Sequence, residues 1–267
     1  MAYQFILMEK ANGIATMTLN RPEKLNALNM PMMDEMRAAF QDAVADEDVR
    51  LLVITGAGRG FCSGADTGGQ AERAAMRAAG QRISKNRHDQ VMPVPVSVDL
   101  HKIEKPTIAA VNGVAAGLGL SLVLACDMAI ATDTAKFGAL WVRRGLIPDG
   151  GATYFLPKLV GKVKSLEMML TGDIVDAKEA ERIGLVSRVV TADKLMPTVN
   201  ELAGKIARGP AVALEITKRA VYKGMDSNLD SAVDFELWGQ HVCYLTEDHK
   251  EAIAAFQGKR DPVFKGR

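Results

Sequence analysis

The sequence predicts an α/β fold that ends in a helical region. Up to Gly150, short runs typical of β-strands alternate with runs of helical periodicity, which favours a layered α/β core. In such cores ligands bind at the turns where a strand leads into a helix. After Gly150 helical patterns dominate. Residues 1–195 are therefore predicted to form the α/β core and residues 196–267 a C-terminal helical region.

The N-terminal pattern is that of a hairpin, a helix and a buried strand. β-Rich runs at residues 4–8 and 13–19 flank Lys10-Ala-Asn-Gly13, a hairpin signal. Residues 50–55 form a short apolar run that predicts a buried strand, followed by a Gly-rich turn at residues 56–60. Between them a helix is predicted from a cap residue and four apolar side chains at helical spacing: Asn29, then Met33, Met36, Phe40 and Val44.

A second unit repeats this pattern. A strand at residues 107–111 leads through the turn Asn112-Gly113 into small residues and an apolar helix at about residues 117–126. Another strand follows at residues 128–131. Between the two units, residues 67–99 are polar, Ala-rich and then interrupted by proline, which predicts a partly helical, mobile segment.

The C-terminal part is predicted to be helical with one brief strand. The strand is expected at residues 185–190. On the penultimate helix Phe235, Trp238 and Val242 recur on one face, so this face is predicted to pack against a partner. The helices are predicted at residues 163–170, 177–183, 192–207, 212–222, 230–244 and 248–256.

Composition excludes several classes of function. The 267 residues include 33 basic and 32 acidic side chains without a basic stripe, so no nucleic-acid partner is expected. The three cysteines form no paired framework and the histidines are scattered, so we expect a reducing compartment and assign no metal. The start lacks a signal-peptide pattern, and the apolar run at residues 121–131 is too short to span a bilayer. A cytoplasmic protein without a membrane partner is expected.

Two Gly-rich turns are suited to binding a developing oxyanion. Residues 63–66 and 116–119 each place backbone N–H groups without bulky side chains after a strand, and the second turn opens a helix. A single turn of this kind equally indicates close packing of a helix on a strand. The competing dinucleotide fingerprint is disfavoured, because Leu122 stands where its third glycine belongs and no suitably placed acidic residue follows.

An ordered set of motifs resembles the crotonase (enoyl-CoA hydratase/isomerase) family over nearly the whole chain. The resemblance is strongest in motif to the Asp-dependent acyl-CoA isomerases of phenylacetate breakdown. The motifs lie at residues 20–27 (NRPEKLNA), 61–66 (FCSGAD), 105–106, 110–117, 126–127, 136–138, 145–151 (GLIPDGG), 170–172 and 180–186.

The resemblance implies a crotonase-like spiral of ββα units whose C-terminal helices build a homotrimer or a dimer of trimers. It implies an acyl-CoA substrate, with coenzyme A as part of that substrate and no tightly bound cofactor. By motif position the N–H groups of Ala65 and Leu118 form the oxyanion hole, beside Gly117 in the substrate pocket. Leu118 departs from the glycine that is usual there, so its side chain must find room away from the acyl group.

The coenzyme A-binding residues are likewise implied by motif position. Phe256 and Lys259 lie where family members bring groups to a neighbouring subunit's coenzyme A. Lys24 is a candidate phosphate contact, although a solvated charge is an equal interpretation. The remaining implied residues are Arg21, Pro22, Ala27, Ser63 and Asp66.

Three residues decide the expected reaction. Ser121 and Trp141 stand where hydratases of the family carry two glutamates, and losing both carboxylates removes the pair that water addition uses. Asp149 stands where the isomerases carry a catalytic aspartate, and one carboxylate suffices to move a proton. The alternatives are structural: Asp149 could cap a helix, Trp141 could be a core aromatic rather than narrow the acyl pocket, and Ser121 could hold water or bond its own backbone.

The sequence therefore predicts an enzyme that stabilises an acyl-CoA enolate and isomerises a double bond with Asp149 as acid and base. A hydratase, a hydrolase and an aryl-CoA dehalogenase with Asp149 as nucleophile remain open within the same fold. The dehalogenase also needs a histidine, and His101 matches no such position. A non-catalytic acyl-CoA-binding protein is the alternative from another class.

Overall fold

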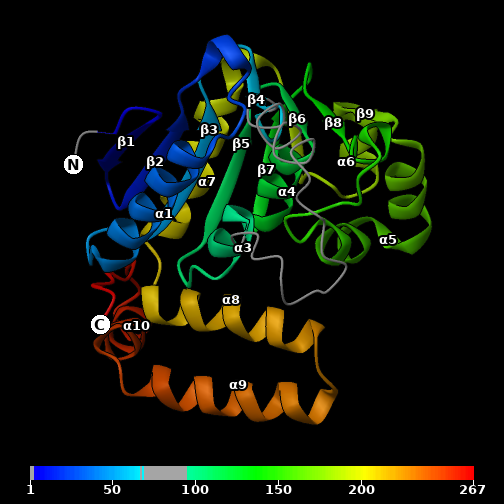
Figure 1. The fold of residues 1–267 in the computed structure, drawn as a ribbon. Coiled ribbons are helices and arrows are strands. Elements are labelled where there is room, and N and C mark those ends of the chain that lie inside the picture. The colour runs from blue at the N-terminus through cyan, green and yellow to red at the C-terminus, as the bar shows by residue number, and fades with distance from the viewer. Residues whose placement is uncertain (1–2, 67, 69–94) are drawn as a thin grey trace.

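The computed structural model describes residues 3–66, 68 and 95–267. Most of the segment predicted to be partly helical, residues 67–99, lies outside the described residues. The described chain forms two sheets with helices around them, which confirms the predicted α/β fold (Figure 1). The six-stranded sheet has the order β1 (Ile6–Ala11), β2 (Ile14–Leu19), β3 (Leu51–Gly56), β5 (Thr107–Val111), β7 (Met128–Thr132) and β10 (Arg188–Val190). The four-stranded sheet has the order β4 (Gly60–Cys62), β6 (Val114–Ala116), β8 (Lys136–Gly138) and β9 (Ile174–Asp176).

The strands come in successive pairs that alternate between the two sheets. In each of the pairs β3–β4, β5–β6 and β7–β8, the first strand joins the large sheet and the second joins the small one. Within each sheet these strands are parallel to their neighbours. The chain therefore winds as a spiral, and the ends of β4, β6 and β8 lie side by side although they are distant in sequence.

The predicted hairpin is confirmed. Strands β1 and β2 pair antiparallel from Ile6 opposite Leu19 to Ala11 opposite Ile14. Asn12 and Gly13 connect them with φ of 54° and 78°, the left-handed conformation that asparagine and glycine tolerate. Strand β2 then pairs parallel with β3, which attaches the hairpin to the sheet.

The helices follow the predicted order, with differences at their ends. The predicted helix at residues 163–170 is only the second half of α5, because Pro157 and Gly161 (φ 77°, ψ 160°) interrupt the pattern and kink the backbone. The bounds are α1 (Met30–Ala45), α3 (Val96–His101), α4 (Leu118–Ala125), α5 (Ala152–Thr171), α6 (Ala177–Arg182), α7 (Leu195–Ala207), α8 (Ala211–Met225), α9 (Leu229–Tyr244) and α10 (Glu247–Gln257), with 3₁₀ turns η1 (Pro22–Lys24), η2 (Val142–Arg144) and η3 (Ala192–Lys194).

Helix α1 begins as predicted, and its buried face overlaps the predicted one at Met36 and Phe40 but leaves out Val44. The side chain of Asn29 accepts a hydrogen bond from Met32 N at 2.9 Å and so caps the helix. Val44 was expected in the core, yet it is 46% exposed. The buried face consists of Met32, Met36, Ala39, Phe40 and Ala43, so two alanines occupy it in place of Val44.

The large sheet is covered on both faces. One face belongs to the main core, which includes residues of α1, α4 and both halves of α5. Helix α7 covers the other face, where Leu195, Val199 and Ala203 pack on strand residues such as Val53 and Ile108. Helix α7 thus lies on the helical side of the predicted division at residue 195, yet it packs on the sheet.

Helices α8 and α9 extend below the sheets as an antiparallel pair (Figure 1). Phe235 and Trp238 stack on the outer pair with ring centroids 5.0 Å apart, and the guanidinium of Arg219 lies over both rings. Trp238 and Leu237 remain exposed. In the described part of the chain, no helix combines the length and apolar character that crossing a bilayer requires.

Candidate functional site

The candidate site lies where three parallel strands of the small sheet end. The turn at residues 63–66 follows β4, Gly117 follows β6, and Trp141 comes shortly after β8. Because the carboxyl ends of parallel strands meet at one edge, the spiral brings the three segments together. Gly119 allows the backbone of α4 to lie directly against the end of β4. A Cβ at this position would lie 2.1 Å from the carbonyl oxygen of Cys62.

Two residues at this place have a backbone N–H without an acceptor in the described part of the chain. Leu28 and Ala65 form a parallel bridge in which Leu28 N donates to Gly64 O and Asp66 N donates to Leu28 O, so the N–H of Ala65 is left over. Leu118 is the first residue of α4, whose N-terminal N–H groups lack intrahelical acceptors. Within residues 3–66, 68 and 95–267, neither N–H donates a hydrogen bond. The helix dipole adds positive potential at Leu118.

The two turns are held together by conformations that suit glycine. Gly64 has φ of 105°, and a Cβ there would lie 2.8 Å from Ala116 O. Gly117 has φ of 53° and precedes the first turn of α4. Leu118, the departure from glycine, is only 7% exposed because its side chain joins the main core near Gly150. Leu118 also lines the cavity, so its backbone stays at the site although its side chain is largely buried.

A small cavity of about 60 Å³ joins these N–H groups to the predicted catalytic carboxylate. The Nε1–H of the buried Trp141 donates to Asp149 Oδ1 at 2.8 Å. Burial raises the pKa of the neighbouring Cys62 thiol to about 12, so this thiol stays protonated. The cavity is lined by Ser63, Gly64, Ala65, Gly117, Leu118, Leu140, Trp141, Arg144, Leu146 and Asp149.

Asp149 does not cap a helix through its side chain. Helix α5 begins at Ala152, its N-cap residue is Gly151, and no side chain caps it. The capping interpretation was therefore wrong. The backbone carbonyl of Asp149 instead accepts from Ala152 N at 3.1 Å, which leaves the carboxylate with Trp141 and solvent.

Ser121 has a role that neither sequence-based alternative described. It is completely buried, and its hydroxyl donates to the carbonyl oxygen of Asp149 at 2.9 Å. The equally buried Ser97 of α3 donates to the next carbonyl, that of Gly150, at 2.8 Å. Ser121 thus bonds neither its own helix backbone nor a group across the cavity, but the segment that carries Asp149.

The predicted coenzyme A-binding residues of the N-terminal half lie together. The Ser63 hydroxyl donates to Lys24 O at 3.2 Å, and Ser63 N donates to Leu25 O at 3.0 Å. Arg21 Nη2 pairs with Asp66 Oδ2 at 2.9 Å, and Arg21 Nη1 donates to the carbonyl oxygen of Ala27. The structure therefore joins the η1 loop, which includes Pro22, to the turn after β4.

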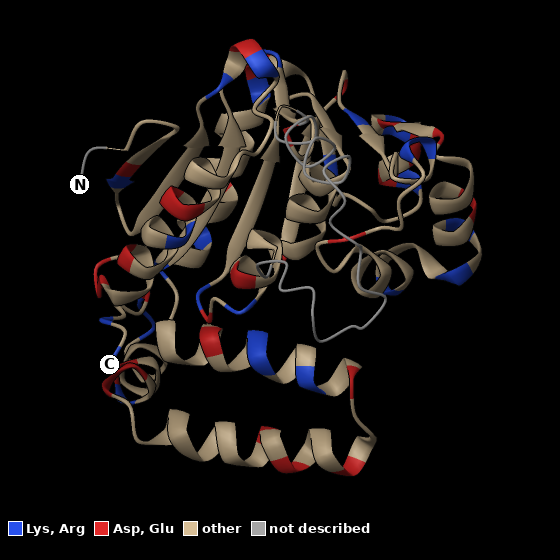
Figure 2. Cartoon of the chain, in the orientation of Figure 1, with Lys and Arg blue, Asp and Glu red and all other residues tan. Residues whose placement is uncertain are grey.

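The η1 loop carries an internal ion pair, Arg21–Asp66, and an exposed charged side chain, that of Lys24. The Gly68 N–H and the Arg21 guanidinium hold the pKa of Asp66 below its ordinary value. Lys24 is exposed, in a turn that carries both signs of charge at the top of Figure 2. The buried Asn26 donates to Ala57 O and Gly60 O and so fixes the loop on the neighbouring turn. Lys24 is thus available to an anionic ligand.

Phe256 and Lys259 are not brought to the cavity within one chain. Phe256 lies on α10 and is 85% exposed, and Lys259 follows that helix with φ of 49°. Their predicted contact with a neighbouring subunit's ligand stays a prediction.

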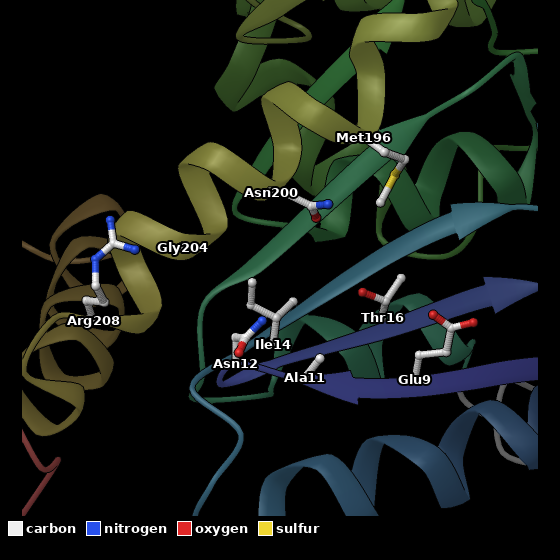
Figure 3. Close-up of a pocket in the computed structure, with 9 residues that line it drawn as sticks. All are labelled: Glu9, Ala11, Asn12, Ile14, Thr16, Met196, Asn200, Gly204 and Arg208. Carbon is white, nitrogen blue, oxygen red and sulfur yellow. The ribbon is translucent and has the colours of Figure 1, made fainter.

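The molecule has a larger concavity elsewhere, between the β1–β2 hairpin and α7 (Figure 3). Its volume is about 680 Å³, and Thr16 of β2 faces Asn200 of α7 across it. No predicted site residue lines it, so volume alone does not identify the site. Among the residues whose positions are described, no cluster of three or more histidine, cysteine or carboxylate side chains could hold a metal.

Sequence patterns missed four residues of the site. Arg144 and Leu146 lie between Trp141 and Asp149, so their place in the same segment could have suggested them. Leu140 precedes Trp141 and could have been included likewise. Ser97 gave no local signal, because it reaches Gly150 from a segment 53 residues away.

Comparisons with known proteins show which family the chain belongs to. The family model described as enoyl-CoA hydratase/isomerase matches residues 9–267. The chain is 38% identical over 265 residues to a crotonyl-CoA hydratase of Syntrophomonas wolfei and 36% identical over 264 residues to a 1,2-epoxyphenylacetyl-CoA isomerase of Escherichia coli, with 99% of each chain covered in both cases. The solved structure of an enoyl-CoA hydratase subunit I from Geobacillus kaustophilus is 37% identical and superimposes with a TM-score of 0.90 over 99% of both chains. The chain therefore belongs to the enoyl-CoA hydratase/isomerase (crotonase) family.

Proposed function

We propose that this enzyme isomerises a double bond in an acyl-CoA thioester, with Asp149 as the acid and base. The observation that carries the proposal is that Asp149 lines the same small cavity as the unpaired N–H groups of Ala65 and Leu118. One carboxylate and one oxyanion site are the two elements that a proton shift next to a thioester requires.

The chemistry follows from charge development. When the thioester oxygen accepts hydrogen bonds from Ala65 N and Leu118 N, negative charge on that oxygen costs less, and the adjacent carbon becomes more acidic. The Asp149 carboxylate takes the α proton of a 3-enoyl-CoA to give a dienolate. It then returns a proton to the γ carbon, which yields the 2-enoyl-CoA and restores the carboxylate.

The coenzyme A moiety is proposed to bind beside the η1 loop. The exposed Lys24 and Pro22 stand at its surface, and Ser63 and Ala27 join it to the cavity. The Arg21–Asp66 pair is proposed to hold the loop in shape, since both side chains already bond each other. Coenzyme A enters as part of the substrate, and no tightly bound cofactor is proposed.

The test compares Asp149→Asn with the wild type. Asparagine keeps an oxygen that can accept from Trp141 Nε1 but removes the base. We expect incorporation of solvent deuterium into a 3-enoyl-CoA to fall by about 100-fold or more. Because Asp149 is exposed, its proton exchanges with solvent, so label should enter during turnover. Mass spectrometry measures the label, and thermal melts should differ little.

The control is Asp48→Asn, which removes an exposed carboxylate on the loop after α1. It should leave both the exchange rate and the melt unchanged. If Asp149→Asn exchanges deuterium as fast as wild type, the proposed role of Asp149 is wrong.

Hydration of a 2-enoyl-CoA is the second candidate, favoured by the hydratase names of several relatives. The site supports hydration less well than isomerisation. The Ser121 hydroxyl is bonded to Asp149 O, and Trp141 Nε1 is bonded to Asp149 Oδ1. Neither side chain can transfer the protons of water at neutral pH. Efficient hydration that survives Asp149→Asn would favour this candidate.

Nucleophilic dehalogenation and hydrolysis have less support. His101 packs against Phe155 and Tyr222, and it is not among the described residues that line the cavity. Burial lowers the pKa of His101, which favours its neutral form. An aryl-CoA panel followed by mass spectrometry would detect either reaction, and binding without turnover would indicate a non-catalytic protein.

A further inference from the structure

We infer that Ser97 and Ser121 are positioning residues that together set the direction of the Asp149 side chain. The inference rests on the proposed function of Asp149. Two buried hydroxyls, one from α3 and one from α4, donate to the consecutive carbonyl oxygens of Asp149 and Gly150 at 2.9 and 2.8 Å. We call these two bonds the serine clamp.

The segment that carries Asp149 has few other anchors. Between η2 and α5 its backbone is neither helix nor strand, and Leu146 and Ile147 are exposed. Gly145 and Gly150 have φ of 67° and 63°, so the chain here is built from residues with wide conformational freedom. Burial of apolar side chains therefore contributes little to fixing the position of Asp149, and the hydrogen bonds from Ser97 and Ser121 contribute more.

The clamp acts where the segment packs most tightly. A Cβ on Gly150 would lie 2.7 Å from both Leu118 Cδ1 and Ser121 Cβ, and 2.8 Å from Ser97 Oγ. The backbone at Gly150 thus lies directly against the start of α4, the helix whose first N–H belongs to the oxyanion site. The two bonded carbonyls belong to the peptide planes on either side of Gly150, and each plane is rigid, so the bonds orient both planes. The first of these planes begins at the Cα of Asp149. This couples the carboxylate to the oxyanion site.

Removing the Ser97 hydroxyl takes a donor from the buried carbonyl of Gly150, and removing the Ser121 hydroxyl leaves the carbonyl of Asp149 with the N–H of Ala152. Either change lets these planes rotate. A small displacement of a catalytic group is enough to lower the rate, since a misplacement of about 1 Å can cost on the order of 100-fold. The effect should appear in kcat rather than KM, because neither serine lies at the proposed coenzyme A loop.

The experiment measures deuterium exchange into a 3-enoyl-CoA for Ser97→Ala, Ser121→Ala and the double variant. The double variant is expected to lose kcat by roughly 100-fold with little change in KM. Ser97→Thr keeps the hydroxyl and should retain most of kcat. The matched control is Ser165→Ala, because Ser165 is as deeply buried on α5, donates to Lys162 O at 2.9 Å and does not line the cavity.

A readout independent of activity follows from the Trp141–Asp149 bond. The chain has two tryptophans, so fluorotryptophan labelling gives two resonances, and Trp141→Phe identifies that of Trp141. The Trp141 resonance should shift in Ser97→Ala and Ser121→Ala and stay unchanged in Ser165→Ala. An unmoved resonance in both alanine variants would overturn the inference.

Combination with Asp149→Asn separates the inference from the proposed function. If the serines act through Asp149, their replacement should cause no further loss in the Asp149→Asn background. Additional losses in that background, or single variants that match Ser165→Ala in kcat, would disprove the clamp. If instead Asp149→Asn alone keeps full exchange, the proposed function fails, while the Trp141 resonance still reports whether the clamp exists.

Discussion

At the scale of single residues, a hydrogen bond joins Trp141 to Asp149 in the candidate site. Trp141 was expected either to narrow the acyl pocket or to be a core aromatic, and in the structure it also donates a hydrogen bond to the Asp149 carboxylate. It is 5% exposed, it lines the cavity, and its Nε1–H holds Asp149 Oδ1 at 2.8 Å. One carboxylate oxygen is thereby fixed, and the other is left for a substrate proton.

Trp141→Phe should therefore lower the rate of deuterium exchange. A hydrogen bond to a charged group is worth about 1.5–3 kcal/mol, which corresponds to a fall in kcat of roughly 10- to 100-fold. Steady-state kinetics with a 3-enoyl-CoA measure this. The matched control is Trp238→Phe on α9, outside the cavity, and an equal loss in both variants would contradict the role of Nε1.

Asp66 should make the η1 loop sensitive to acid. Its folded pKa lies below the ordinary value of 3.8, mainly because of the Gly68 N–H and then Arg21. A lowered carboxyl pKa contributes stability that is present above the unfolded pKa and is lost as the pH falls through the folded pKa. Asp66→Asn should therefore reduce stability at neutral pH, by up to ~1 kcal/mol for a partly exposed pair.

Thermal melts of wild type and Asp66→Asn between neutral and acid pH measure this difference. The two curves should converge below the lowered pKa of Asp66, and Asp48→Asn serves as the control carboxylate. A difference that grows as the pH falls would show that the sign is wrong.

At the scale of elements, the site depends on how closely α4 approaches β4. Cys62 O occupies the place that a side chain at position 119 would need. This contact keeps the N–H of Leu118 beside that of Ala65, because the turn at residues 63–66 follows Cys62 directly. Glycine is thus required at position 119 for space.

Gly119→Ala should separate the two turns. Overpacking of this kind costs about 1–3 kcal/mol of stability, and deuterium exchange should fall as the two N–H groups proposed to bind the thioester oxygen move apart. The control is Gly204→Ala on α7, where an added Cβ would lie 3.4 Å from the flexible end of Arg208. It should be neutral or stabilising by up to about 1 kcal/mol. Melts and exchange rates that are unchanged in Gly119→Ala would contradict the packing argument.

At the scale of the whole molecule, the outer surface of α8 and α9 is predicted to bind further copies of the chain. Leu229 and Leu237 are exposed on α9, the helix that also carries the stacked Phe235 and Trp238. A trimer has a mass of three times 28.7 kDa, about 86 kDa. Light scattering at micromolar concentration should give this mass or its double, and a compact monomer would contradict the prediction.

A variant pair locates the interface. Leu237→Glu places a charge on α9 and should lower the mass by weakening association. Val163→Glu is the control, because Val163 is similarly exposed but lies on α5. Equal masses for both variants would place the interface elsewhere.

The sequence by itself determined the order of elements and the chemistry of several turns. Asn12-Gly13 predicts its hairpin because these residues tolerate left-handed backbone, and Asn29 predicts a helix start because its side chain accepts from the first turn. The two Gly-rich turns predicted an oxyanion site, and the ordered motifs predicted the family. These signals are local, so they can be read along the chain.

Tertiary structure decided which residues meet. Val44 is exposed although its spacing fits a helix face, because the exact buried stripe depends on what α1 packs against. Ser97 and Ser121 reach carbonyls 53 and 28 residues away, and the capping role suggested for Asp149 was replaced by its bond to Trp141. A hydroxyl can bond to any carbonyl that the fold brings within reach, so the local sequence does not determine its partner. The partner is determined by the spiral of strands, which brings distant strand ends to one edge of the sheet.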